Sequence, residues 1–122
     1  MNRKWDLEGD LYLLTTEQGG RKTPVLSRYR PIHKLYDNYW SSGSHEYFDV
    51  LSVAPGDTAK VRVWLVTPEV YPNCLWHGRK IDVIEGLRCV GNLTVTQVVN
   101  EKLVGTAESH HPVRIKPEYF PD

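Results

Sequence analysis

Residues 58–67 constrain the fold of this chain most strongly. The odd-numbered side chains from Ala59 to Leu65 are apolar, and they alternate with Lys60, Arg62 and Trp64. Successive side chains of an extended chain point to opposite faces, so this pattern predicts a β-strand with one face in a core. Sustained helical periodicity occurs nowhere in the 122 residues. The sequence therefore predicts an all-β protein.

Further segments rich in β-branched and aromatic residues predict additional strands. We expect them at about residues 5–15, 29–36, 46–51, 79–84 and 87–99. Gly, Pro, Asn and Ser lie between the segments and supply the backbone angles of tight turns. The predicted turns are residues 19–20, 41–44, 55–57, 72–73 and 85–86. About six strands of this length predict a closed antiparallel barrel or a two-sheet sandwich, because closure removes exposed edges.

The strand pattern ends near Glu101. We expect residues 1–100 to form one domain, for which the 40% hydrophobic content supplies a single core. Residues 101–122 are predicted to be a C-terminal tail, either mobile or draped over the barrel. Its candidate anchors are Val113, Ile115, Tyr119 and Phe120.

The composition indicates which kinds of molecule the protein could bind. The 15 basic and 15 acidic side chains cancel, so a nucleic-acid partner would have to meet a local basic patch. The chain has no apolar run long enough to cross a membrane, and its polar start lacks the apolar middle of a secretory signal. Its two cysteines, Cys74 and Cys89, are typical of reduced thiols. We expect a cytoplasmic protein with no membrane partner.

The stretch Gly-Gly-Arg-Lys-Thr at residues 19–23 has some of the composition of a phosphate-binding loop. That motif needs glycines at the positions of Thr16 and Arg21, and it must open a helix. Pro24 instead pushes the preceding residue away from the helical region. The sequence therefore predicts no nucleotide site, no GTPase activity and no cofactor.

The same stretch begins a run of cations with no carboxylate between Glu17 and Asp37. Such side chains can contact backbone phosphates, and Tyr29 or Tyr36 could add a stacking face. A solvated loop with no ligand is the alternative interpretation. The run consists of Arg21, Lys22, Arg28, Arg30 and Lys34.

Metal and catalytic sites are weakly indicated. Cys74, His77 and Cys89 could supply soft ligands together with His33 or His45, but the spacing fits two buried thiols and a surface imidazole better. No local signature of a nucleophile or general base surrounds the polar candidates, so we predict no metal site and no enzyme. These candidates are Ser27, Ser41, Ser42, His45, Glu46 and Asp49.

Two longer motifs resemble one known family. Residues 18–24 read Gln-Gly-Gly-Arg-Lys-Thr-Pro, and residues 29–31 read Tyr-Arg-Pro. With Pro-Gly-Asp at 55–57 and Glu-Gly-x-Arg-x-Val-Gly at 85–91, they resemble the third, C-terminal β-barrel domain of elongation factor Tu. The resemblance covers about residues 5–99. It implies a six-stranded antiparallel β-barrel followed by a C-terminal extension.

In that family the domain packs against the GTPase domain and a second barrel, and it binds the T-stem of aminoacyl-tRNA. By position, the resemblance implies RNA contacts for Arg21, Arg30, Glu85 and Arg88. Ser41 lies where the family has a threonine that contacts tRNA. Ile32 replaces the family's glutamine, and residues 36–42 replace its threonine-rich run.

Two functions therefore remain open. Because the barrel begins within a few residues of Met1, we expect a stand-alone, non-catalytic module of translation that binds tRNA or another structured RNA. The alternative is a protein-interaction module that mimics the elongation factor barrel to bind its protein partners. An aromatic group absent from the family pattern suggests this alternative, because such residues often anchor interfaces. The group consists of Tyr36, Tyr39, Trp40 and Tyr47.

Overall fold

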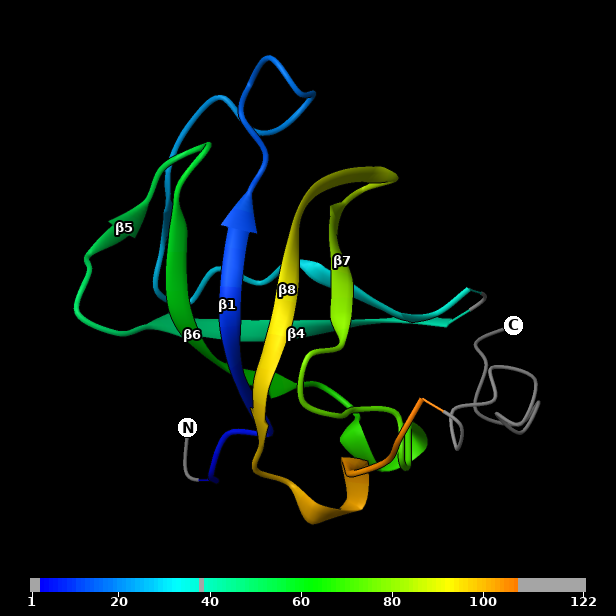
Figure 1. Cartoon of the computed structure of the whole chain (residues 1–122). Coiled ribbons are helices and arrows are strands. Elements are labelled where there is room, and N and C mark those ends of the chain that lie inside the picture. The colour runs from blue at the N-terminus through cyan, green and yellow to red at the C-terminus, as the bar shows by residue number, and fades with distance from the viewer. Residues whose placement is uncertain (1–2, 38, 108–122) are drawn as a thin grey trace.

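The computed structural model of the protein describes residues 3–37 and 39–107, which form a closed β-barrel. The neighbouring strands pair antiparallel in the order β1-β6-β4-β3-β7-β8, and β8 pairs with β1 to close the barrel (Figure 1). This confirms the expected six-stranded antiparallel barrel. The barrel strands are β1 (Leu7–Leu13), β3 (Ile32–Tyr36), β4 (Tyr39–Tyr47), β6 (Thr58–Leu65), β7 (Lys80–Glu85) and β8 (Arg88–Val98).

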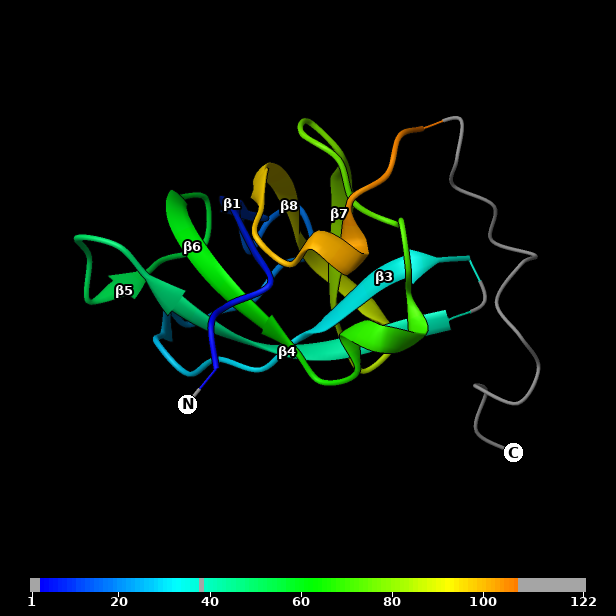
Figure 2. The same cartoon turned by 90° about the horizontal axis from the view of Figure 1, so that it is seen from below.

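Four short elements accompany the barrel. A two-stranded ribbon pairs β2 (Val25–Leu26) with β5 (Ser52–Val53), and β5 lies outside the barrel beside the end of β4 (Figure 2). The 3-10 helices are η1 (Pro68–Val70) and η2 (Glu101–Leu103). No helix of the described residues is long and apolar enough to cross a membrane.

The core lies inside the barrel because every second side chain of each strand points inward. The alternation predicted for residues 58–67 is confirmed: in β6, Ala59, Val61, Val63 and Leu65 are buried and the residues between them are not. β1 follows the same period from Leu7 to Leu13. Burial of these apolar side chains is the main favourable contribution to folding, at about 25 cal/mol per Å².

β4 differs from the sequence prediction. Residues 41–44 were expected to form a turn and residues 46–51 a strand, but the strand spans Tyr39–Tyr47 and the following residues leave the barrel. The small residues are needed because an imidazole lies inside the wall here. A Cβ at Gly43 would lie 2.9 Å from Cε1 of His33, which is closer than two carbon atoms can pack.

Part of the predicted tail belongs to the barrel. Leu103 is fully buried, and its carbonyl accepts a hydrogen bond of 2.9 Å from the backbone N–H of Leu75. Gly105 donates in turn to the carbonyl of Leu75, at 2.8 Å. Residues 103–105 therefore lie against the loop that follows η1. The candidate anchors Val113, Ile115, Tyr119 and Phe120 lie outside the described residues.

Asp6, immediately before β1, joins three strands at one end of the barrel. Its buried carboxylate accepts hydrogen bonds of 2.9 and 3.1 Å from the guanidinium of Arg3 and of 2.7 Å from the backbone N–H of Leu65, the last residue of β6. The side-chain amide of Asn100 donates to the same carboxylate at 2.9 Å. The Asp6 carbonyl accepts from the backbone N–H groups of Val99 and Asn100, just after β8. One residue thus holds the ends of β6 and β8 against the start of β1.

We predict that Asp6→Ala lowers the free energy of unfolding by about 3 kcal/mol or more, because it leaves several donors at the barrel end without an acceptor. Urea denaturation followed by tryptophan fluorescence measures the change. Asp82→Asn, at an exposed position of β7, is the matched control and should alter stability by less than about 0.5 kcal/mol. An equally small effect of Asp6→Ala would contradict the role of Asp6 in holding the strand ends together.

Candidate nucleic-acid interface

Residues 28–31 continue β3 along the edge of β4. The backbone N–H of Arg28 donates to the carbonyl of His45 at 2.7 Å, and the N–H of His45 donates to the carbonyl of Tyr29 at 2.9 Å. Further along, the N–H of Gly43 donates to the carbonyl of Pro31 at 3.1 Å. Residues 29–36 therefore run along the edge of β4, and Arg28 lies in the turn that precedes them.

This segment and the turn before it carry three cations at least partly exposed to solvent, Arg28, Arg30 and Lys34, which we call the cationic strip. Arg28 and Arg30 are exposed, and the Lys34 ammonium lies 5.9 Å from the centre of the Trp40 ring. Within residues 3–37 and 39–107, no carboxylate forms an ion pair with any of the three. Their charges are therefore available to an anionic partner.

A second group of polar residues meets at the turn between β7 and β8. A carboxylate oxygen of Glu85 accepts hydrogen bonds from both the Arg21 guanidinium and the Tyr29 hydroxyl. The Arg21 guanidinium also lies 5.3 Å from the centre of the Tyr29 ring. Burial, followed by the hydrogen bond to Glu85, raises the pKa of Tyr29 well above its ordinary value. Arg88, opposite Glu85 in the β-hairpin, stays exposed.

The predicted RNA-binding residues thus separate into different environments. Arg28, Arg30 and Lys34 share the cationic strip, and Lys22 is also exposed. Arg21 and Glu85 form an ion pair with each other.

Ser41 requires a correction, because it is only 4% exposed and shares the inward face of β4 with His45. Its hydroxyl donates to the carbonyl of Ser42 at 3.1 Å. The sequence predicted that Ser41 lies in a turn. It lies instead in the barrel wall, where its side chain is not accessible to a ligand.

The aromatic group proposed for a protein interface also requires a correction. Tyr36 and Tyr47 are buried, at 6% and 7% exposed, and Tyr39 and Trp40 are half-buried. The Tyr39 ring packs 5.3 Å from that of the buried Tyr71, and the Tyr36 ring stacks on Tyr71 at 6.5 Å. Tyr39 and Tyr47 share the inward side of β4, and Tyr36 is buried after a register irregularity between Lys34 and Tyr36, so these tyrosines extend the core. Trp40 remains at the surface beside the cationic strip.

Two imidazoles meet inside the barrel, a feature that sequence reasoning missed. Nε2 of His33 lies 2.8 Å from Nε2 of His45, and Nδ1 of His33 lies 3.0 Å from the carbonyl oxygen of Ser41. Because a carbonyl only accepts, Nδ1 of neutral His33 carries the proton and its Nε2 accepts from His45. Nδ1 of His45 then accepts from the Tyr47 hydroxyl, at 3.4 Å. Each imidazole therefore has one defined tautomer.

Both imidazoles are neutral in the folded protein. Burial lowers the pKa of His33 to about 4, against an opposing contribution from the hydrogen bond to Ser41. Burial also lowers the pKa of His45 well below its ordinary value, with a further contribution from His33. No serine hydroxyl of the described residues bonds either ring. The arrangement therefore does not resemble a nucleophile with its general base.

No metal centre forms within the described part of the chain, where no three His, Cys, Asp or Glu side chains gather in a way that could hold an ion. Cys74 is buried and Cys89 is exposed, so only one of the two expected buried thiols is confirmed. Burial raises the pKa of the Cys74 thiol to about 12. His77 lies at the surface, as predicted.

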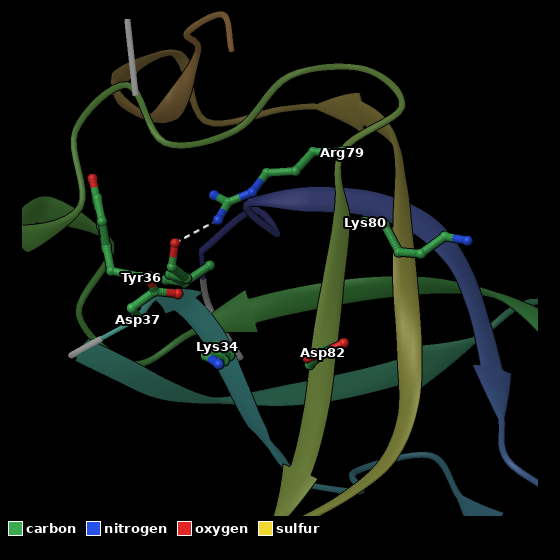
Figure 3. A pocket seen from close by; sticks show the side chains of 7 residues that line it. Lys34, Tyr36, Asp37, Arg79, Lys80 and Asp82 are labelled. Atoms are coloured by element: carbon green, nitrogen blue, oxygen red, sulfur yellow. Dashed lines mark hydrogen bonds between the residues drawn. The ribbon is translucent and has the colours of Figure 1, made fainter. Parts of the chain in front are cut away.

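Arg79 joins β7 to β3 at the same end of the barrel as Asp6. Its guanidinium donates to the carbonyls of Cys74 and Leu35 and stacks 5.0 Å from the centre of the Trp76 ring. It lines a hollow of about 220 Å³ together with Lys34, Tyr36, Asp37, Lys80 and Asp82. Figure 3 shows Arg79 reaching toward the end of β3, while Lys80 points away from it. Arg79 is thus occupied in joining the start of β7 to β3.

No known family model matches the chain. The described residues form a small closed antiparallel β-barrel, and among them Arg28, Arg30 and Lys34 have no carboxylate partner.

We predict that acid destabilises the protein through its imidazole pair. Because the folded-state pKa values lie below the ordinary 6.5, the unfolded chain takes up protons first, and stability that is complete above pH 6.5 is lost toward pH 4. The free energy of unfolding should fall by about 2 kcal/mol between pH 7 and 5 through His33, and the lowered pKa of His45 should add to that loss.

Urea denaturation at several pH values measures this slope. His33→Gln/His45→Gln should flatten it, whereas His77→Gln, at an exposed position, should leave it unchanged. A slope that survives in the double variant would assign the acid sensitivity to other groups.

Proposed function

We propose that the protein is a non-catalytic module of translation that binds tRNA or another structured RNA through the cationic strip. The observation that carries this proposal is the group Arg28, Arg30 and Lys34, which are at least partly exposed and have no carboxylate partner among the described residues. Arg30 and Lys34 are four residues apart, about 13 Å in an extended chain. Cations separated in this way can reach different phosphates along one RNA strand.

The β7–β8 turn supports the same proposal. Arg88 is exposed there, and Glu85 is held in place by Arg21 and Tyr29. In the resemblance to the elongation factor Tu barrel, Arg21, Glu85 and Arg88 match positions of the tRNA-binding surface. That resemblance is what suggests translation rather than another RNA process.

The placement of the titratable groups favours binding over catalysis. The two imidazoles bond each other inside the barrel, where burial keeps them neutral. Tyr47, their hydrogen-bond partner, has a raised pKa because it is buried. A reactive group must reach its substrate, and these groups lie inside the wall.

Exposed apolar side chains favour a second candidate function. Leu26, Val50 and Leu51 lie in or next to the β2–β5 ribbon and are 62%, 44% and 91% exposed. Apolar groups of this kind are typical of protein interfaces. The second candidate is therefore a protein-interaction module that mimics the elongation factor barrel to bind its protein partners, through the ribbon rather than the buried tyrosines.

We predict that Arg28→Gln/Arg30→Gln/Lys34→Gln weakens tRNA binding at least tenfold at low salt. Each lost phosphate contact should also reduce the slope of log affinity against log salt by about one. Fluorescence anisotropy with labelled aminoacyl-tRNA measures both quantities.

The matched control is Lys4→Gln/Lys60→Gln/Lys102→Gln, which removes equal charge at exposed positions off the strip. Binding that is absent at low salt, independent of salt, or weakened equally by both triple variants would refute the proposal. Specific capture of a translation protein that Leu51→Ser abolishes, without tRNA binding, would establish the second candidate.

A further inference from the structure

A hollow of about 240 Å³ opens on the outer wall where the cationic strip begins. Three neighbouring segments form it, because Ser44 of β4 pairs with Trp64 of β6 on one side and Arg28 bonds to the backbone of His45 on the other. Its lining residues are Ser27, Arg28, Ser44, His45, Glu46 and Trp64.

Arg28 adopts an unusual backbone conformation at this hollow. Its φ of 80° lies in the left-handed region, which a residue with a side chain occupies at a cost of about 1 kcal/mol or more. The hydrogen bond of its N–H to the His45 carbonyl, 2.7 Å long, stabilises this conformation. Such strain concentrates at binding sites, and here it accompanies an exposed guanidinium that no carboxylate of the described residues pairs.

Trp64 forms a prearranged aromatic wall. Its indole N–H donates to the Arg3 carbonyl at 2.8 Å, and its ring packs edge to face against Trp5 at 6.1 Å. The ring plane is therefore fixed before any ligand arrives. An aromatic surface fixed in this way stacks on a base without the entropic cost of ordering a mobile side chain.

The remaining polar groups of the hollow are a serine hydroxyl and a carboxylate that is already paired. The Ser27 hydroxyl oxygen accepts from the backbone N–H of Tyr47 at 3.1 Å, which leaves its proton free to donate. The Glu46 carboxylate is 3.0 Å from the guanidinium of Arg62, so its charge is partly compensated. The hollow thus offers a cation, a hydroxyl donor and an aromatic ring.

We propose that this hollow holds a single unpaired nucleotide of the bound RNA, with its phosphate on Arg28 and its base against Trp64. The inference rests on the proposed RNA-binding function and specifies the part of the RNA that is recognised. Bases inside a duplex have both faces covered by their neighbours, so only an unpaired nucleotide can present a face to Trp64. The preferred ligand is therefore RNA in which the paired stem lies along the strip and a bulge or loop enters the hollow.

Fluorescence anisotropy with two RNAs tests this inference: a fully paired duplex and the same duplex with a single bulged nucleotide. The wild-type protein should bind the bulged RNA at least about fivefold more tightly, the effect of one base stacked on an aromatic ring. Trp64→Leu should remove that preference and leave duplex affinity unchanged. Arg28→Gln should weaken binding of both RNAs.

Two further variants keep the result interpretable. Trp64→Phe retains an aromatic face and should retain the preference, while Trp40→Leu, beside Lys34 at the other end of the strip, should not affect it. The bulged RNA should quench tryptophan fluorescence in the wild type and less so in Trp64→Phe, which tests the contact even if Trp64→Leu fails to fold.

Equal wild-type affinity for the two RNAs, or quenching unchanged in Trp64→Phe, would overturn the nucleotide site and leave the proposed RNA-binding function intact. Failure to bind either RNA at low salt would instead refute the RNA-binding function, and the nucleotide site with it.

Discussion

The carboxylate of Asp6 is the interaction on which the rest of the structure depends. It connects Arg3, the end of β6 and the residue Asn100 after β8, so the first strand is held between its two neighbours at the end where the barrel must close. A closed barrel fixes which side of each strand faces inward. The surface strip and the buried imidazoles both follow from that geometry.

Residues 28–36 show how one segment can serve two purposes. Arg28, Arg30 and Lys34 are at least partly exposed, and His33 is buried beside Gly43. A slip of one residue in register would place cations in the core and apolar groups in water. The packing of the interior therefore determines which side chains of this segment, the cations included, face solvent.

Alternation in β6 and the turn residues between strands are local signals, and they predicted a closed barrel or a sandwich. The resemblance to the elongation factor Tu barrel implied the barrel. The prediction failed in β4, where Ser41 and Gly43 look like a turn but lie at inward positions of a strand. The basic run Arg28, Arg30 and Lys34 was visible in the sequence. The pairing of Arg21 with Glu85 could not be predicted, because it joins residues far apart in the chain.

The hydrogen-bond chain from Tyr47 through His45 and His33 to the carbonyl of Ser41 runs in one direction only. A backbone carbonyl at its end cannot donate, so the chain cannot reverse by proton hopping while the barrel stays closed. Because both rings are buried, their N–H protons should exchange with solvent only when the wall opens, locally or as a whole.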